Sequence, residues 1–218
     1  MTPRQPATAG ELRRSALVVA PLTAAALIAQ QVASNAVRDA LFLTWFEVTS
    51  LPYFMGAAAV LAIPAAESSG RLLGRFGPAR VVPFILGVSS VLFLVEWRLL
   101  GAHPRLVSGL VYFHASVLGA IGISAFWSLL NERFDPHSAK ALMARVAAAA
   151  TLGGLAGGVG AERVAALMSQ GALFTLLGLS AGASVVGSAV IGRGMPARRG
   201  QPAVQEERIR AWAALHGH

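Results

Sequence analysis

The sequence predicts an all-α membrane protein with six transmembrane helices, and three observations support this prediction. Six apolar stretches are long enough, or nearly so, to cross a bilayer, for which a helix needs roughly 20 residues. They are continuous rather than alternating, which favours helices over barrel strands. Only 13% of the residues are charged, whereas an ordinary soluble domain has about 25%. The stretches are 17–33, 51–66, 81–101, 106–130, 141–159 and 171–191.

The basic residues fall on alternate sides of these six stretches. If the N-terminus is cytoplasmic, four of the 18 Lys and Arg residues lie outside, and these are Arg38, Arg98, Arg105 and Arg163. The positive-inside rule therefore predicts that both termini are cytoplasmic. We expect a cytoplasmic tail over 1–13, a six-helix domain over 14–192 and a second cytoplasmic tail over 193–218. The net charge of +8 is explained by this topology, so we expect no nucleic-acid partner.

The first apolar stretch is predicted to be a retained helix rather than a cleaved signal peptide. Its apolar part is long for a signal peptide, and five further stretches follow it. The helix is expected to continue towards Arg38 and Asp39. The aromatic segment 40–46 that follows is typical of the outer membrane interface, where aromatic rings gather.

The second and third stretches are joined by a basic segment that contains several glycines. Residues 70–80 read GRLLGRFGPAR, which predicts a tight turn between two helices on the cytoplasmic side. Such a loop can contact a neighbouring bundle in one conformation and release it in another. A short positively charged turn without further function is an equally good interpretation.

The fifth and sixth stretches are rich in glycine and alanine. Gly153 with Gly157, and Gly154 with Gly158, are spaced four residues apart on one helix. Glycines at this spacing let two helix backbones approach closely in a membrane. We expect these four residues to serve helix packing, with sliding of the helix pair as the alternative. After the sixth stretch, residues 205–215 have the pattern of a short amphipathic helix.

Charged residues at membrane depth are candidates for function. Arg38 and Asp39 are the strongest pair, because neighbours on a helix point about 100° apart and are expected to pair across helices rather than with each other. Either a substrate or gating role or a structural interhelical pair fits them. The other charges lie near predicted boundaries, where their side chains can reach the interface. These are Glu47, Glu67, Glu96, Arg98, Glu162 and Arg163.

His114, in the fourth stretch, is grouped with Arg38 and Asp39 as a candidate substrate or gating residue. It can act as a proton relay, although a single such histidine is more often a hydrogen-bonded structural residue. An enzymatic alternative comes from residues 178–182, which read GLSAG. The same pattern forms the nucleophile elbow of hydrolases, but that motif needs a strand, a turn and a helix rather than a continuous span. The sequence contains no cysteine, no phosphate-binding loop and no metal-ligand spacing. We therefore expect no enzyme activity, cofactor or metal.

The segment 70–80 resembles the signature loop of the major facilitator superfamily, which lies between the second and third helices of these carriers. Gly70, Arg75, Gly77 and Arg80 match that motif. Gly74 stands where the family carries an aspartate. The resemblance implies that the arginines of this loop latch the inner side of a carrier.

A second resemblance is to the ATP/ADP antiporter family of plastids and intracellular bacteria. It spans residues 11–190, which correspond to the N-terminal half of a twelve-helix carrier. The Arg38–Asp39 pair is similar to a basic-acidic pair of that family, and 153–158 is similar to its glycine motif in the fifth helix. At the exit of the fourth stretch the matching region includes Phe126, Trp127, Asn131, Glu132 and Lys140.

These resemblances imply a secondary transporter in a plasma membrane, such as a bacterial inner membrane, that exchanges nucleotides such as ATP and ADP or moves another organic anion. Arg38 would contact the anion or help close the outer gate, and Asp39 would orient Arg38 or take part in coupling. Six helices make only one lobe, so a second copy or a separate chain is expected to supply the other. The alternatives are a non-transporting anchor, assembly or sensor module, or a fragment of a longer carrier.

Overall fold

The computed structural model describes residues 9–134, 140–167 and 170–194, and in this part of the chain all regular structure is helical. Six helical segments are long and apolar enough to cross a membrane, so the predicted all-α membrane fold is confirmed. The fourth span is built from three consecutive pieces, of which the middle one is π-helical. The elements are α1 (Ala9–Trp45), η1 (Val48–Ser50), α2 (Leu51–Phe76), α3 (Pro78–Leu100), α4 (Pro104–Phe113), η2 (His114–Leu118), α5 (Gly119–Arg133), α6 (Lys140–Leu167) and α7 (Gln170–Gly194).

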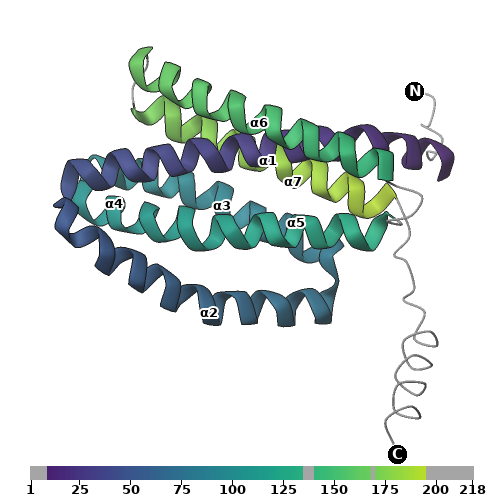
Figure 1. Cartoon of the computed structure of the whole chain (residues 1–218), viewed down its shortest axis with the longest axis horizontal. Helices are drawn as coiled ribbons and strands as arrows, with labels where there is room; N and C mark the ends of the chain where they lie inside the picture. The colour runs from purple at the N-terminus through teal and green to yellow at the C-terminus, as the bar shows by residue number, and fades with distance from the viewer. Residues whose placement is uncertain (1–8, 135–139, 168–169, 195–218) are drawn as a thin grey trace, which may run out of the picture.

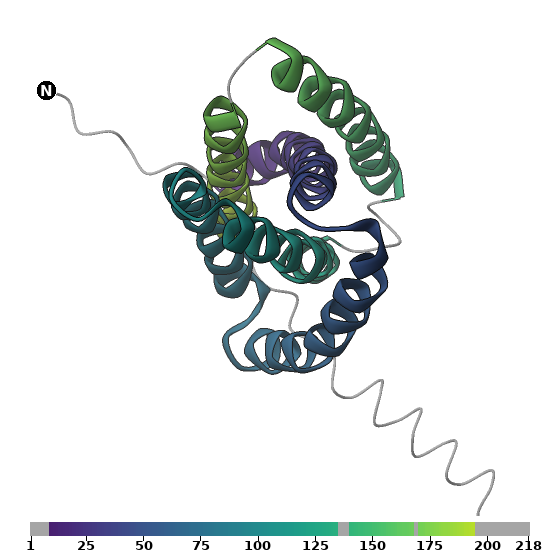
Figure 2. The same cartoon turned by 90° about the vertical axis from the view of Figure 1, so that its left-hand side faces the viewer.

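Helix α1 lies at the centre of the bundle. It packs against α6 and α7 on one side and against the fourth span on the other, while α3 packs against α5 and α7 (Figures 1 and 2). Helix α2 lies at the edge. We call the end that contains the α2–α3 turn, on the right in Figure 1, the basic end. It carries Arg75, Arg80, Arg133, Lys140 and Arg193.

Helix α1 is longer than the sequence predicts at both ends. It begins at Ala9, before the expected domain boundary at residue 14, and it continues to Trp45. The aromatic segment 40–46 therefore belongs almost wholly to the helix, and Arg38 lies about two turns inside it. The tail 195–218, with its predicted amphipathic helix, lies outside the described residues.

Two apolar clusters fill the bundle. The one nearer the basic end includes Val82, Leu129 and Ile191, whose side chains are fully buried. The other surrounds Phe93 and Phe174. Helix α2 contributes only Ala58 to the buried set, although its apolar side chains are large and numerous. Such exposed apolar surface is expected where a helix faces lipid, because lipid tails are as apolar as the side chains.

The glycines of α6 lie against α1. A Cβ at Gly153 would collide with the backbone of Ala25, and one at Gly157 with the backbone of Ala29. Gly154 and Gly158 meet only side chains, at 3.3 Å from Ile28 and 3.6 Å from Val32. Thus the first pair lets the two backbones touch, while the second borders the same contact.

The predicted loop over residues 70–80 is wrong in its extent. Helix α2 continues through Gly70 and Arg75 to Phe76, and α3 begins at Pro78, so Gly77 alone forms the turn. Gly70 and Gly74 lie inside the helix with open space around them. A single glycine weakens a helix by only about 1 kcal/mol, which the rest of α2 can offset. The chain reverses at Gly77 because its φ of +78° is left-handed and Pro78 can start the next helix.

We expect Gly77→Ala to lower the stability of the protein, because an L-residue at positive φ costs about 1 to 2 kcal/mol. Gly74→Ala is the matched control, since it adds the same methyl group inside α2, where nothing lies within 4 Å. The measurement is the melting temperature of the purified protein in detergent. Equal melting temperatures for the two variants would contradict the prediction.

Candidate functional site

A cavity of about 540 Å³ opens between α1, α2 and the fourth span. We call it the Arg38 cavity. Its wall on α1 carries the charged pair Arg38 and Asp39, and its other walls are mainly apolar. The lining residues are Arg38, Asp39, Phe42 and Leu43 from α1, Leu51, Met55 and Ala58 from α2, Tyr112 from α4 and Ser116 from η2.

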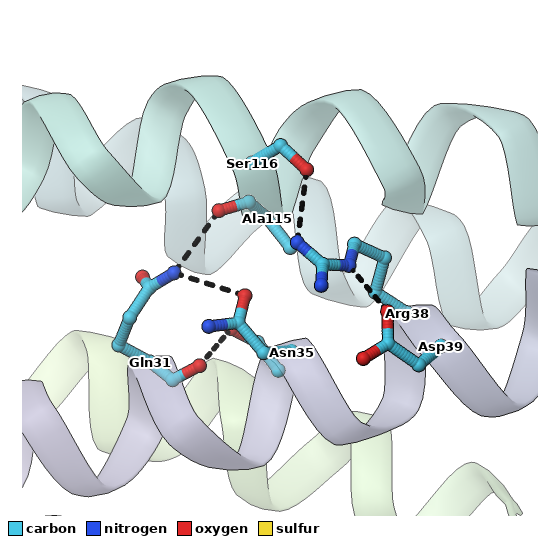
Figure 3. Close-up of polar contacts among 7 residues, drawn as sticks. Gln31, Asn35, Arg38, Asp39, Ala115 and Ser116 are labelled. Carbon is cyan, nitrogen blue, oxygen red and sulfur yellow. Dashed lines mark hydrogen bonds and ion pairs between the residues drawn. The ribbon is translucent and has the colours of Figure 1, made fainter. Parts of the chain in front are cut away.

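Arg38 pairs with its own neighbour, contrary to the expectation that this pair is split between helices. Its Nε donates to Asp39 Oδ1 at 2.8 Å, and its Nη1 donates to Ser116 Oγ at 3.1 Å (Figure 3). The long arginine side chain bends back along α1, so the 100° between the two Cβ directions does not prevent the contact. The interhelical partner is a serine hydroxyl rather than a carboxylate.

The guanidinium group of Arg38 also lies over an aromatic ring. Its Cζ is 5.3 Å from the centre of the Tyr112 ring, within the range of a cation–π contact. The Arg38 side chain is 23% exposed and that of Asp39 is 56% exposed. Together the carboxylate, the hydroxyl and the ring fix the direction of Arg38 while leaving it open to the cavity.

About two turns before Arg38, a polar contact joins α1 to the fourth span. Gln31 Nε2 donates to the backbone oxygen of Ala115 at 3.0 Å and to Asn35 Oδ1 at 3.2 Å (Figure 3). This contact needs Gly119, because a Cβ there would collide with the amide of Gln31. Residues Ala115 and Ser116 of η2 thus accept hydrogen bonds from two α1 residues that lie about two turns apart, Gln31 and Arg38.

A cluster of aromatic rings borders the cavity, and two of its members, Phe42 and Tyr112, belong to the cavity lining. Phe42 is 1% exposed, and its ring centre lies 5.2 Å from that of Tyr112 and 5.0 Å from that of Phe54. Phe46 and Phe113 extend the cluster. Because the cluster joins α1, α2 and α4, it holds α2 in place beside the Arg38 cavity.

His114 does not line the Arg38 cavity with Arg38 and Asp39, with which the sequence grouped it. Its Nδ1 lies 2.9 Å from Glu96 Oε1, and its Nε2 lies 2.8 Å from Ser89 Oγ. The side chains of Glu96 and His114 are each only 4% exposed. The expectation that Glu96 reaches the membrane interface is therefore wrong, because α3 turns this carboxylate inward onto the histidine.

The residues at the exit of the fourth span do not gather at one place. Phe126 is buried in the core and Trp127 packs against it, whereas Asn131 is exposed. The Glu132 carboxylate lies 4.0 Å from Arg133, and Lys140 starts α6 as an exposed residue. At the basic end Arg75 lies over the ring of Phe76. These groups lie apart from the Arg38 cavity.

The serine of the GLSAG pattern lies in the middle of the continuous helix α7. The hydroxyl of Ser180 donates to the backbone oxygen of Leu177 at 3.0 Å. A nucleophile elbow needs a sharp strand-to-helix turn that exposes the serine. Ser180 therefore lacks the local geometry that the motif requires.

Sequence reasoning missed the polar partners on α3 and the fourth span, namely Ser89, Tyr112 and Ser116. Each is a common residue within an apolar stretch, and which helices face each other is not encoded in a local pattern. Gln31 and Asn35 carry a detectable signal, because two amides spaced four residues apart lie on one face of a membrane helix.

Comparison with known proteins identifies no relative of this chain. No protein-family model matches this chain, and no curated protein or solved structure is significantly similar to it.

Proposed function

We propose that this chain is a secondary transporter of the major facilitator type, or one lobe of one, and that it binds an organic anion in the Arg38 cavity. The observation that carries the proposal is a cation held at membrane depth beside an open cavity. Ionisable residues in that position are rare and usually functional.

The chemistry of the cavity favours a small organic anion. Its volume of about 540 Å³ falls within the roughly 300 to 1,000 Å³ of small-molecule sites. Arg38 donates one hydrogen bond to Asp39 and one to Ser116, whereas a guanidinium carries five N–H donors. The remaining donors suit a carboxylate or phosphate. The apolar walls and Tyr112 can pack against an organic or aromatic part of the same molecule.

The transporter type rests on the sequence resemblance and on the six-span architecture. Alternating access requires a second lobe that moves against the first around the binding site. We propose that a second copy or a separate chain supplies it. The arginines of the basic end would then lie in the cytoplasm, in agreement with the positive-inside rule.

Nucleotides such as ATP and ADP are the first substrates to test, because the resemblance names them. A triphosphate would be expected to use several cations, and Arg38 is the only arginine or lysine among the residues that line this cavity. An anion with one carboxylate or phosphate fits this charge better, so both kinds of probe belong in the test.

The test measures binding of labelled ATP, ADP and an organic monocarboxylate to the full chain in lipid nanodiscs. We expect Arg38→Ala to weaken binding roughly ten- to 150-fold, the equivalent of losing a hydrogen bond to a charged group, about 1.5 to 3 kcal/mol. Arg98→Ala is the matched control, since Arg98 lies over Trp97 outside the cavity.

Three outcomes would contradict the proposal. Unchanged binding in Arg38→Ala would remove the arginine from the site, and equal losses in both variants would indicate a general charge effect. Absence of binding by every probe would favour the alternative of a non-transporting membrane module.

A further inference from the structure

Three polar side chains meet inside the bundle, away from the Arg38 cavity. Ser89 and Glu96 come from α3 and His114 from η2, and we call them the His114 cluster. Ser89 Oγ lies 2.8 Å from His114 Nε2, and the Glu96 carboxylate oxygens lie 2.9 and 3.1 Å from Nδ1. All three residues are more than nine-tenths buried. Both ring nitrogens of the histidine are therefore engaged.

This arrangement can hold an additional proton without losing a hydrogen bond. With one proton on the ring, Nδ1 donates to Glu96 and Nε2 accepts from the Ser89 hydroxyl. With a second proton on Nε2, the ring donates in both directions and Ser89 Oγ becomes the acceptor, because a hydroxyl can rotate to serve in either role. The added proton turns a buried pair of net charge −1 into a neutral ion pair.

The surroundings of the cluster are apolar. The ring of Phe93 lies 4.3 Å from that of His114, and Phe93 belongs to the same buried cluster as Val107 and Val111. A net charge in such surroundings is costly unless it is neutralised. A proton is the smallest ligand that neutralises it.

Charged side chains also occur on α3 itself and on the helices that pack against α3 and η2. Arg38 contacts Asp39 and Ser116, and Arg98 lies over Trp97. Arg80 precedes Glu96 by 16 residues on α3, which is about 24 Å along a helix. Beyond residue 16, the described titratable or charged side chains on elements packed against α3 and η2 are Arg38 and Asp39 on α1, Tyr53, Glu67, Arg71 and Arg75 on α2, Arg80 and Arg98 on α3, Arg105 and Tyr112 on α4, Glu132 and Arg133 on α5, and Arg193 on α7.

The same geometry resembles the Ser–His–carboxylate order of a hydrolase, but it favours proton binding over nucleophilic attack. Ser89 lies in the middle of the continuous helix α3. The backbone N–H groups beside it are used within that helix, whereas acyl transfer needs free N–H donors for the oxyanion. The buried Oγ of Ser89 is also shielded from a substrate.

The π-helical segment connects the His114 cluster to the Arg38 cavity. His114 is the first residue of η2, and the next two residues receive the hydrogen bonds of α1, Ala115 from Gln31 and Ser116 from Arg38. A π-helical turn is an irregular segment within a helix and often occurs at functional sites. A change in the position of the His114 ring therefore acts on a five-residue segment that also holds Arg38.

We propose that Ser89, Glu96 and His114 form a proton-binding site in the membrane, and that its occupancy is transmitted through η2 to the Arg38 cavity. The proton comes from water and binds at Nε2 of His114, and no covalent bond changes. Only the meaning of the transmission for transport rests on the proposed function. The binding of the proton is a property of this cluster by itself.

The first experiment follows the protonation of His114 directly. The full chain is labelled with ¹⁵N-histidine in lipid nanodiscs, and its NMR spectrum is recorded across the pH range in which histidines change charge. The signal that is missing from the spectrum of His114→Gln is assigned to His114. We expect the His114 signal to convert from the neutral to the cationic form in the wild type, with a different midpoint in Glu96→Gln. A wild-type signal that keeps one protonation state throughout would overturn the proposal.

The second experiment tests the transmission. The chain contains no cysteine, so Leu43→Cys places a single environment-sensitive dye at an exposed position that lines the Arg38 cavity. We expect the dye emission to change with the same pH midpoint as the His114 signal, and this change to be lost in the Glu96→Gln background. The matched control is a dye at Val186→Cys on α7, exposed and outside the cavity.

Dye emission that does not change with pH, or that changes equally at both dye positions, would overturn the proposal that protonation is transmitted to the Arg38 cavity. Neither experiment uses a substrate. If every anion fails to bind, the proposed function fails while the NMR titration still decides the proton site. If the anion binds but His114 keeps one protonation state, the proton site fails while the proposed function stands.

Discussion

Replacing Gly153 and Gly157 together by alanine is expected to force α6 away from α1 and to destabilise the bundle strongly. A Cβ at either position would collide with backbone atoms of Ala25 or Ala29, which cannot rotate away as a flexible side chain can. An added methyl group in a packed interior typically costs about 1 to 3 kcal/mol. The two sites lie on one interface, so their combined cost falls on a single helix pair.

The measurement is the free energy of unfolding in mixed micelles titrated with a denaturing detergent. Gly160→Ala is the matched control, because it lies on the same helix and a Cβ there meets nothing within 4 Å. Alanine is the better helix former by about 1 kcal/mol, so the control is expected to be neutral or stabilising. A double variant as stable as this control would show that α1 and α6 do not touch through these glycines.

Phe42→Ala is expected to lower the free energy of unfolding by about 3 to 5 kcal/mol, as large-to-small substitutions of buried aromatic residues do. Phe42 is 1% exposed and contacts three other rings, Phe46 just after α1, Phe54 on α2 and Tyr112 on α4. Its loss leaves a hole where α2 is attached to the rest of the bundle. Since α2 buries little else, this helix is expected to become loose first.

The control for this prediction is Phe84→Ala on α3, where the ring is 65% exposed and faces the lipid side. Its truncation is expected to change stability little, because lipid fills the space. Hydrogen exchange of the α2 backbone provides the second measurement, and we expect it to rise in Phe42→Ala only. Equal effects of the two substitutions would contradict a special role of the aromatic cluster.

Much of the fold follows from the sequence because a bilayer imposes strong rules on composition. A helix must be apolar over about 20 residues to cross it, and this requirement locates all six spans. Helix ends are harder to locate. Arg38 and Asp39 were expected near the end of the first helix, yet α1 continues to Trp45. A membrane helix can extend past its apolar stretch, and no local signal ends it there.

The candidate site was predictable only in part. Arg38 and Asp39 are visible in the sequence because charges are rare at membrane depth. Their pairing with each other was not predicted, because the direction of the Cβ atoms says little about a side chain as long as arginine. His114 was visible for the same reason as Arg38, but its position away from the cavity was not.

The sequence by itself determined that this chain is an all-α membrane protein with six spans, since hydrophobic length and the avoidance of charge are properties of single segments. Only the tertiary structure decided that Ser116 holds Arg38 and that Ser89 and Glu96 hold His114. These contacts join helices distant in the chain, and they depend on how each helix is rotated about its own axis. That rotation results from the packing of the whole bundle, to which every helix contributes.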